Sequence, residues 1–388
     1  MTVRVSKPEF NLREKITELD KPSGVKGNEL LRSETTQEAR DLIGSGRKNL
    51  IINGNMQIAQ RGTSTTTMGY LIDRFASGAA NINNPTYAQV DVASGTEPYA
   101  AGFRKAAKFT GGNNAVHNND VLKLNHGVEA QNLATSGWDY KSGASFITLS
   151  FWVKSSVGQT FFGRLQTIDG TDQNYAFSYE VSANTWTKVV KTIPGNSNIT
   201  IDNDAGEGLD IEWTLFRGID TTASTTVVNK WQAYSSGGRL PDGVPSTWHD
   251  TNGATWEITG VQLEVGRNAT EFEHLSHQEE LALCQRYFYK NTDSPMGLFI
   301  ADSADSGKAY GIYRFPVPMR IAPDIVLRDN NGNGDGKVTQ HGAAHNLAAT
   351  ASQIQKEGFS RVLRTGATFN TSAAMPIVCG VTSADAEL

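Results

Sequence analysis

The chain contains 388 residues, of which 38 are glycine and 19% are charged. This length allows two or three domains, and the many glycines between short apolar blocks favour a turn-rich all-β protein over a helical one. The formal net charge of −5 provides no basic face, and no apolar run is long enough to cross a membrane, so we expect neither nucleic-acid binding nor membrane insertion.

Residues 1–46 are charged and contain a single aromatic residue, Phe10, so they cannot bury a core by themselves. Amphipathic helices are predicted over Asn11–Leu19 and from Thr35 onward. The segment is either a frayed leader or a stretch that becomes ordered by docking onto a partner or by winding with copies of itself. We predict an attachment and oligomerisation segment, with apolar contacts from Leu12, Ile16, Leu19, Leu42 and Ile43.

Residues 47–275 have a β pattern throughout, with Gly, Asn and Asp between short apolar blocks. Phe146–Lys154 (FITLSFWVK) has the strongest strand pattern, Leu50–Ile58 opens the region and Trp256–Val265 closes it. This spacing is typical of a two-sheet sandwich, and the first and last strands of a jelly roll are neighbours. We therefore predict a jelly-roll β-sandwich with further strands at Thr86–Val92, Thr160–Ile168, Tyr175–Val181, Trp186–Ile193 and Ile211–Phe216.

Residues 276–290 are predicted to form an amphipathic helical connector. Ser276 and Glu279 have the spacing of a capping box, and apolar residues follow at helical spacing at Leu281, Cys284 and Phe288. The domain boundary is therefore placed near residue 275.

Residues 291–388 are predicted to form a small C-terminal β domain. Residues 310–329 alternate well apart from prolines 316, 318 and 323, which favour an edge strand or a bulged pair. Residues 357–388 contain the pattern of further strands. This domain is the expected tip of the molecule.

The sequence also bears on where the chain folds. Cys284 and Cys379 are its only cysteines, and their wide separation predicts two packed thiols, with neither a disulfide framework nor a metal pattern. Residues 1–20 lack the apolar core of a signal peptide. We expect the protein to fold in a cytosol.

Several separated motifs resemble one family. NLIINGNMQIAQRG, YLIDRF, LNHGVEAQNL, FITLSFWVKSS, WTKV and GVQLEVG resemble the carbohydrate-binding-module-like jelly roll of phage tail-fibre and receptor-binding proteins. The leader MTVRVSKPEFNLREKI is similar to the start of tail-fibre proteins in podoviruses of marine bacteria. PVPMR followed by a proline, and the final ADAEL, resemble the distal ends of such fibres.

The resemblance implies a setting for the protein. It would be a virion component made in the host cytoplasm, attached to the phage tail or an adaptor protein through residues 1–46, and assembled as a homotrimer. Its binding partner would be a bacterial surface polysaccharide. The resemblance does not supply the identity of the sugar.

Two acidic stretches were considered as sites. Asp202, Asp204, Glu207 and Asp210 are separated by Asn and Gly, as in a solvated hairpin loop. A loop stiffened by calcium is one alternative, and catalysis by a carboxylate pair is the less favoured one. In the second stretch Asp329, Asn331, Asn333 and Asp335 match the first half of a calcium loop, but Gln340 stands where the bidentate Glu belongs. We expect no catalytic residues, no metal and no cofactor, and interpret the second stretch as a loop at the tip. A structural calcium ion stays an alternative.

Aromatic residues are the natural sugar-binding groups, because a flat ring covers the apolar face of a pyranose. Trp231, Tyr234, Arg239 and Trp248 lie in a Gly-, Ser- and Pro-rich stretch where rings are hard to bury, so they are the candidate glycan-binding residues. Loop packing or subunit contact is the alternative role.

A second aromatic group, Tyr287, Phe288 and Tyr289, is consecutive in the sequence, so at least one ring must face away from its own element. We expect Tyr287 and Phe288 to take part in assembly, at a neck where subunits pack together.

The sequence therefore predicts a non-enzymatic tail fibre that recognises a bacterial cell-surface glycan during adsorption. One alternative is a capsid or tail decoration protein with a purely structural role. The other is a polysaccharide-degrading tailspike or a glycosidase accessory module, although the chain lacks the long repeats of most such spikes.

Overall fold

The computed structural model describes Arg32 and residues 48–82, 85–111, 118–291, 297–329, 336–340, 344–369 and 376–388. The chain divides into two compact units, Met1–Lys48 and Asn49–Leu388. The predicted contact residues Leu12, Ile16, Leu19, Leu42 and Ile43 lie outside the described residues.

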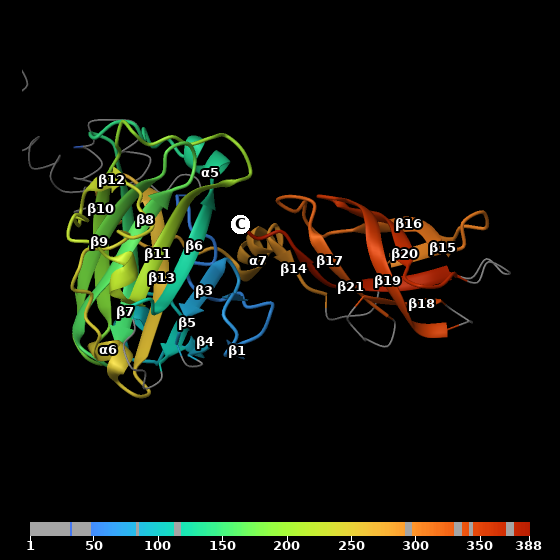
Figure 1. The fold of residues 1–388 in the computed structure, drawn as a ribbon, viewed down its shortest axis with the longest axis horizontal. Helices are drawn as coiled ribbons and strands as arrows, with labels where there is room; N and C mark the ends of the chain where they lie inside the picture. The colour runs from blue at the N-terminus through green and yellow to red at the C-terminus, as the bar shows by residue number, and fades with distance from the viewer. Residues whose placement is uncertain are drawn as a thin grey trace, which may run out of the picture. The chain divides into compact units, whose positions relative to one another are not determined.

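Two antiparallel sheets form the body of the second unit (Figure 1). The first sheet has the order β1 (Ser64–Thr65), β4 (Thr86–Asp91), β5 (Lys105–Thr110), β13 (Thr255–Val265), β7 (Phe146–Ser155) and β10 (Thr187–Pro194). The second sheet has the order β12 (Trp231–Ala233), β9 (Gln173–Val181), β8 (Gln159–Thr167), β11 (Glu207–Arg217), β6 (Val121–Glu129), β3 (Phe75–Ala80) and β2 (Tyr70–Ile72). The chain crosses repeatedly between the sheets, as in a jelly-roll sandwich. The predicted all-β class is confirmed.

The core of the body lies between the two sheets. Strand β7 turns Ile147, Leu149 and Phe151 inward at alternate positions, and all three are buried. The ring of Phe151 meets that of Trp213 from β11 edge-on at a centroid distance of 5.8 Å. Because successive strand residues point to opposite faces, this alternation leaves the other face of each sheet free for polar side chains.

The opening segment Leu50–Ile58, predicted as a strand, is irregular. Asn53 and Met56 have φ angles of 61° and 58°, a left-handed conformation that interrupts a strand. The segment still lies beside the closing strand, because the Leu50 amide donates to the Leu263 carbonyl at 2.9 Å. The first and last segments of the sandwich therefore lie side by side, as expected. The opening segment does not form a regular strand.

Short helices lie between the strands: α4 (Glu97–Ala100), α5 (Ala130–Ala134), the 3₁₀ helix η1 (Ile219–Thr221), α6 (Thr247–Asp250) and α7 (His277–Gln285). In α7 the predicted capping box between Ser276 and Glu279 is confirmed. Phe288 does not extend the helix as predicted, because α7 ends at Gln285 and Phe288 lies in a strand. No helix within the described part of the chain is long and apolar enough to span a membrane.

The remaining strands form a third sheet, which we call the C-terminal sheet. Its order is β14 (Phe288–Tyr289), β21 (Pro376–Asp385), β15 (Gly297–Ala301), β16 (Lys308–Arg314), β20 (Gly358–Arg364), β19 (Ala344–Gln355) and β18 (Lys337–Gln340), and β17 (Asp324–Arg328) also pairs with β21. Because β18 pairs with β21 as well, six strands close into a ring around a core that includes Phe299, Tyr313 and Phe359. The three prolines predicted to disturb residues 310–329 lie between β16 and β17. Both cysteines are buried free thiols, as predicted.

Candidate functional site on the outer face of the second sheet

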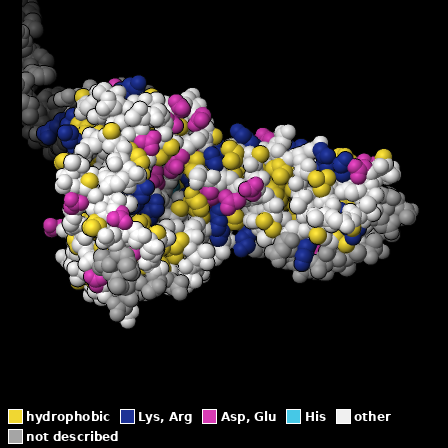
Figure 2. Space-filling model, viewed as in Figure 1, with side chains coloured by type: hydrophobic (Ala, Val, Ile, Leu, Met, Phe, Trp, Pro, Cys, Tyr) yellow, Lys and Arg dark blue, Asp and Glu magenta, His cyan; other side chains and the backbone are white. Residues whose placement is uncertain are grey.

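The face of the second sheet that points away from the core, here called the outer face, is polar. Strand β11 turns Ile211 and Trp213 into the core and places Asp210 and Glu212 on the outer face. Glu212 lies between Asn125 on β6 and Arg164 on β8 in the strand register. In the view of Figure 2, side chains of both charges lie over this sheet.

Glu212 is the centre of a buried charge network on this face. Its carboxylate is paired with Arg164 at 2.9 Å and Arg217 at 2.8 Å, and it accepts a hydrogen bond from the Thr214 hydroxyl at 2.6 Å. Burial by itself would raise the pKa of Glu212, but Arg164 and Arg217 hold it well below its usual value. Because every charge is paired, the network fixes the shape of the face and does not provide a reactive group.

A chain of side-chain hydrogen bonds continues from this network toward β9 and β12. Arg164 donates to the Gln166 side chain at 2.5 Å, and Gln166 donates to the carboxylate of Asp172 at 2.8 Å. The carbonyl of Asp172 then accepts from the Tyr234 amide at 2.9 Å. The chain connects the centre of the sheet to the loop that follows β12.

At this end of the face lies a cavity of about 270 Å³, which we call the neutral pocket. Its walls contain amides, hydroxyls and small residues and no charged side chain: Asn174, Ala223, Thr225, Thr226, Gln232, Ala233, Ser235, Gly237 and Gly238. Strands β9 and β12 form one wall and the loop on either side of β12 forms the other. Such a lining can donate and accept hydrogen bonds without favouring a positively or a negatively charged ligand.

Asn174 gives the neutral pocket an unsatisfied acceptor. Its side chain is 2% exposed, and its Nδ2 donates to the Arg239 carbonyl at 2.9 Å. A carbonyl oxygen can only accept, so the orientation of the amide is fixed and Oδ1 is the remaining atom. This Oδ1 is buried and has no hydrogen-bond partner.

The loop wall of the neutral pocket is held in place by its own hydrogen bonds. Gln232 accepts from the Val227 amide at 2.7 Å and donates to the Thr225 carbonyl at 3.0 Å. The Thr226 hydroxyl donates to the Gly238 carbonyl at 2.7 Å. The pocket is therefore formed before any ligand arrives, which lowers the entropic cost of binding.

A second cavity of about 330 Å³, the acidic pocket, lies on the same face over β3, β6 and β11. Asn125 donates to both carboxylate oxygens of Asp210, at 2.9 and 2.8 Å. Burial, followed by repulsion from Asp210, raises the pKa of Glu207 to about 7. The pocket is lined by Tyr70, Ala76, Ser77, Gly78, Lys123, Asn125, Gly127, Glu207, Asp210 and Leu388.

The four acidic residues of the stretch from 202 to 210 lie in two different places. Glu207 and Asp210 share the acidic pocket, whereas Asp202 and Asp204 are exposed in the preceding loop, where the Asp204 side chain accepts from the Gly206 amide at 2.8 Å. No group of three His, Cys, Asp or Glu side chains suited to a metal ion occurs among the residues that the structure describes.

The structure contradicts a sugar-facing role for two predicted residues. Trp231 is 6% exposed, and its indole donates to the Pro194 carbonyl at 2.7 Å. Trp248 is fully buried, and its indole donates to the Thr255 carbonyl at 3.0 Å. Both rings join the core of the sandwich because each indole N–H finds a backbone acceptor there.

Tyr234 and Arg239 remain partly exposed and lie beside the neutral pocket. The guanidinium Nε of Arg239 donates to the Tyr234 hydroxyl at 2.9 Å. Their chain neighbours Ala233, Ser235 and Gly238 line the pocket. The predicted stretch therefore contributes to the lining of the neutral pocket, mainly through its small and polar residues. Sequence reasoning missed Asn174, because a polar residue at an outward strand position is ordinary.

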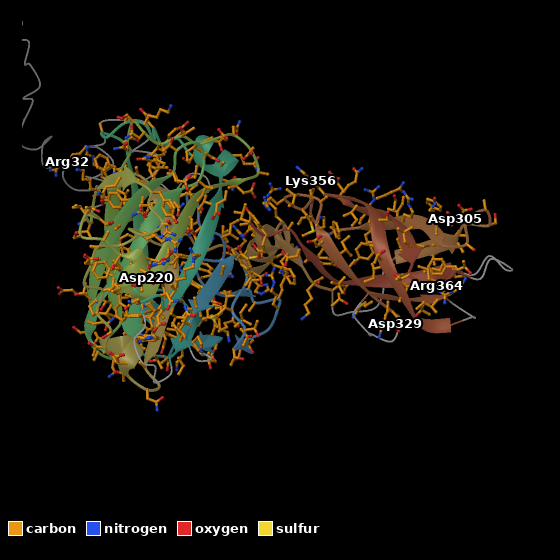
Figure 3. All side chains as sticks on the ribbon, viewed as in Figure 1. Arg32, Asp220, Asp305, Asp329, Lys356 and Arg364 are labelled. Carbon is orange, nitrogen blue, oxygen red and sulfur yellow. The ribbon has the colours of Figure 1, made fainter. Side chains whose placement is uncertain are left out.

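The predicted tip loop is described only in part. Asp329 follows β17 (Figure 3) and is buried, and Asn331, Asn333 and Asp335 lie outside the described residues. The alternative of a structural calcium ion at this loop therefore stays a prediction.

Tyr287 and Phe288, predicted for subunit contact, are buried by their own chain. The Arg74 guanidinium lies 3.6 Å from the Tyr287 ring centre, and that of Arg61 lies 3.4 Å from the Phe288 ring centre. The two rings are 1% and 5% exposed, so they are not available to a neighbouring subunit. That prediction is corrected.

No family model and no curated protein matches the chain. Among solved structures, it is similar to a family 16 carbohydrate-binding module, at 11% identity over 55% of this chain and 99% of that chain, with a TM-score of 0.26.

 A putative sugar-binding protein from Bacteroides thetaiotaomicron shares 13% identity over 56% of this chain and 100% of its own, with a TM-score of 0.28. A cyclase from Fischerella sp. TAU shares 9% identity over 58% of this chain and 100% of its own, with a TM-score of 0.33.

Proposed function

We propose that this protein is a phage tail fibre that recognises a bacterial surface glycan through the outer face of the second sheet. In this proposal it is a homotrimer in the virion, and residues 1–46 attach it to the tail or to an adaptor protein. The sequence motifs of the leader and the sandwich support the fibre setting. The lining of the neutral pocket supports the recognition of a glycan.

The observation that carries the glycan proposal is Asn174, a residue that lines the neutral pocket and whose Oδ1 is buried without a hydrogen-bond partner. Leaving such a buried acceptor unsatisfied costs about 1–3 kcal/mol, and a ligand that donates a hydrogen bond recovers this cost. The other lining groups are hydroxyls, amides and small residues. A neutral ligand rich in hydroxyl groups, such as a sugar, matches this lining better than a charged one.

The ligand that fits best is an extended oligosaccharide. The neutral and acidic pockets lie on the same face, and β8 lies between the strands that line them, β9 and β11. Two inter-strand spacings amount to roughly 10 Å, which is more than one sugar ring spans. Weak binding at each site becomes useful when three subunits and several fibres engage one surface together.

The test is the binding of labelled full-length protein to an array of bacterial surface polysaccharides. Asn174→Ala removes the unpartnered acceptor, and we expect it to weaken binding at each site roughly tenfold, the equivalent of one hydrogen bond. Ser178→Ala is the matched control, since Ser178 lies on the same strand and face but does not line the pocket. Circular dichroism checks that both variants fold.

The outcome that would overturn the glycan proposal is equal binding by Asn174→Ala, Ser178→Ala and the unchanged protein. Failure of all three to bind, together with normal adsorption of particles that lack the protein, would favour the decoration alternative.

A second candidate function is polysaccharide cleavage, and Glu207 with Asp210 is the observation that favours it. Two carboxyl groups share one pocket, and the raised pKa of Glu207 is a property of a general acid. Release of reducing ends from a bound polysaccharide, abolished in Asp210→Asn, would establish this activity. Binding without release would support the non-enzymatic proposal.

A further inference from the structure

Residues Asp385–Leu388, which we call the latch, leave the C-terminal sheet and contact the body. Asp385 is the last residue of β21 and pairs with Phe288 of β14. The next residue, Ala386, donates its amide to the Tyr287 carbonyl at 2.7 Å. Figure 1 shows that the chain then ends beside β6 and α7. The latch therefore connects the C-terminal sheet to the body.

Glu387 forms the main ionic contact of the latch. Its side chain is 5% exposed and is paired with Arg74 and, at 3.3 Å, with Arg61. Arg74 is fully buried, and its second guanidinium nitrogen donates to the Gly127 carbonyl of β6 at 2.7 Å. Arg74 also has a φ of 69°, a strained conformation that persists only where its surroundings hold it.

Arg320 joins the backbone of the latch to the body. Its guanidinium donates to the carbonyls of Ala386, Glu387 and Ala205, each at 2.7 Å. Ala205 belongs to the body loop before β11, so one side chain holds both partners. The Tyr70 hydroxyl of β2 donates to the Leu388 carbonyl at 2.9 Å and fixes the end of the latch.

The connector after α7 adds a second set of contacts next to the latch. Arg286 donates two hydrogen bonds of 2.8 Å to the buried carboxylate of Glu129, which also accepts from the Tyr287 hydroxyl. Leu388 packs with a small apolar cluster that includes Ile52 and Cys284. Ionic, backbone and apolar contacts thus meet at one junction.

We infer that the latch is a conformational device that fixes the C-terminal sheet onto the body and makes the two unfold together. A buried ion pair that loses one partner leaves an uncompensated charge, so the device depends on Glu387. It depends on Arg320 as well, because loss of that side chain leaves three backbone carbonyls without their donor. Leu388 also lines the acidic pocket. Closing the latch therefore completes one wall of that pocket.

The distribution of tryptophan provides the test. All seven tryptophans lie in the body, between Trp138 and Trp256, so tryptophan fluorescence reports unfolding of the body alone, whereas far-ultraviolet circular dichroism reports both parts. In the full-length protein we expect the two signals to change in one coincident thermal transition. In Glu387→Gln and Arg320→Met we expect a separate circular-dichroism transition for the C-terminal sheet, roughly 5–10 °C below the fluorescence transition.

Asp385→Asn is the matched control within the latch. The Asp385 side chain is 46% exposed in its pair with Arg61, and exposed ion pairs contribute little to stability. Its transitions should stay coincident. Coincident transitions in Glu387→Gln and Arg320→Met would overturn the inference.

Native-state hydrogen exchange of the unchanged protein gives a test that does not require a variant to fold. The Ala386 amide should be protected as strongly as amides in the core strands of the body, because its exchange requires the latch to open. Exchange of this amide at the rate of an unstructured residue would also overturn the inference.

Discussion

At the scale of single residues, the acidic pocket shows how burial changes the chemistry of a carboxyl group. Glu207 is partly buried beside Asp210, and burial, followed by repulsion from Asp210, raises its pKa from the ordinary glutamate value to about 7. The folded state therefore binds more protons than the unfolded state between these two values. Stability is highest below the unfolded pKa and falls as the pH rises toward 7.

We predict that Glu207→Gln raises stability at pH 8 by about 2 kcal/mol and leaves it nearly unchanged at pH 4. The amide removes the cost of ionising a buried carboxyl and fits the same space. Urea unfolding of both proteins across this pH range, followed by fluorescence, measures the difference. A constant difference at all pH values would contradict the assignment of the titration to Glu207.

The two misassigned tryptophans belong to the same scale. Trp231 and Trp248 were predicted to be sugar-facing from the composition of their segment, and both are buried. A Gly-, Ser- and Pro-rich stretch indicates a loop but does not indicate which way its large side chains point. That direction depended on acceptors in distant residues, Pro194 for one indole and Thr255 for the other.

At the scale of elements, α7 is a helix whose beginning is predicted correctly from its capping residues alone. The Ser276 hydroxyl accepts from the Glu279 amide at 3.3 Å, and the Glu279 carboxylate accepts from the Ser276 amide at 3.0 Å. A helix of nine residues is marginal by itself. Its buried residues Glu280 and Cys284 supply the remaining stabilisation.

We predict that Ser276→Ala lowers the free energy of unfolding by about 1 kcal/mol, because one terminal amide loses its side-chain acceptor. Urea denaturation at pH 7 measures the loss. Ser276→Asp is the control and should retain most of the stability, since aspartate is an equally good cap. An alanine variant as stable as the unchanged protein would show that the cap is not needed.

At the scale of the whole molecule, the chain divides at residue 48 into a leader and one compact unit, Asn49–Leu388. The sandwich and the C-terminal sheet fall within that unit, and the latch residues form hydrogen bonds to both of them. The sequence placed the beginning of the sandwich close to this division, at residue 47. It placed a boundary near residue 275 as well, where α7 follows the sandwich.

We predict that a protein lacking residues 1–46 folds with an unchanged thermal transition, because Asn49–Leu388 forms a compact unit separate from Met1–Lys48. Circular dichroism measures the transition. In the proposed function the shortened protein also loses its trimeric state, which sedimentation equilibrium measures against the full-length chain. A shortened protein that stays trimeric would assign assembly to the remaining residues.

The sequence by itself determined the all-β class, most strands of the sandwich, the capped helix α7 and the two packed thiols. These features depend on the period of apolar residues and on capping residues, which are local in the chain. Only the tertiary structure decided the neutral pocket around Asn174, the burial of Trp231 and Trp248, and the latch at Glu387. Each of these depends on residues far apart in sequence that meet only when the sheets pack, and no local pattern encodes such a meeting.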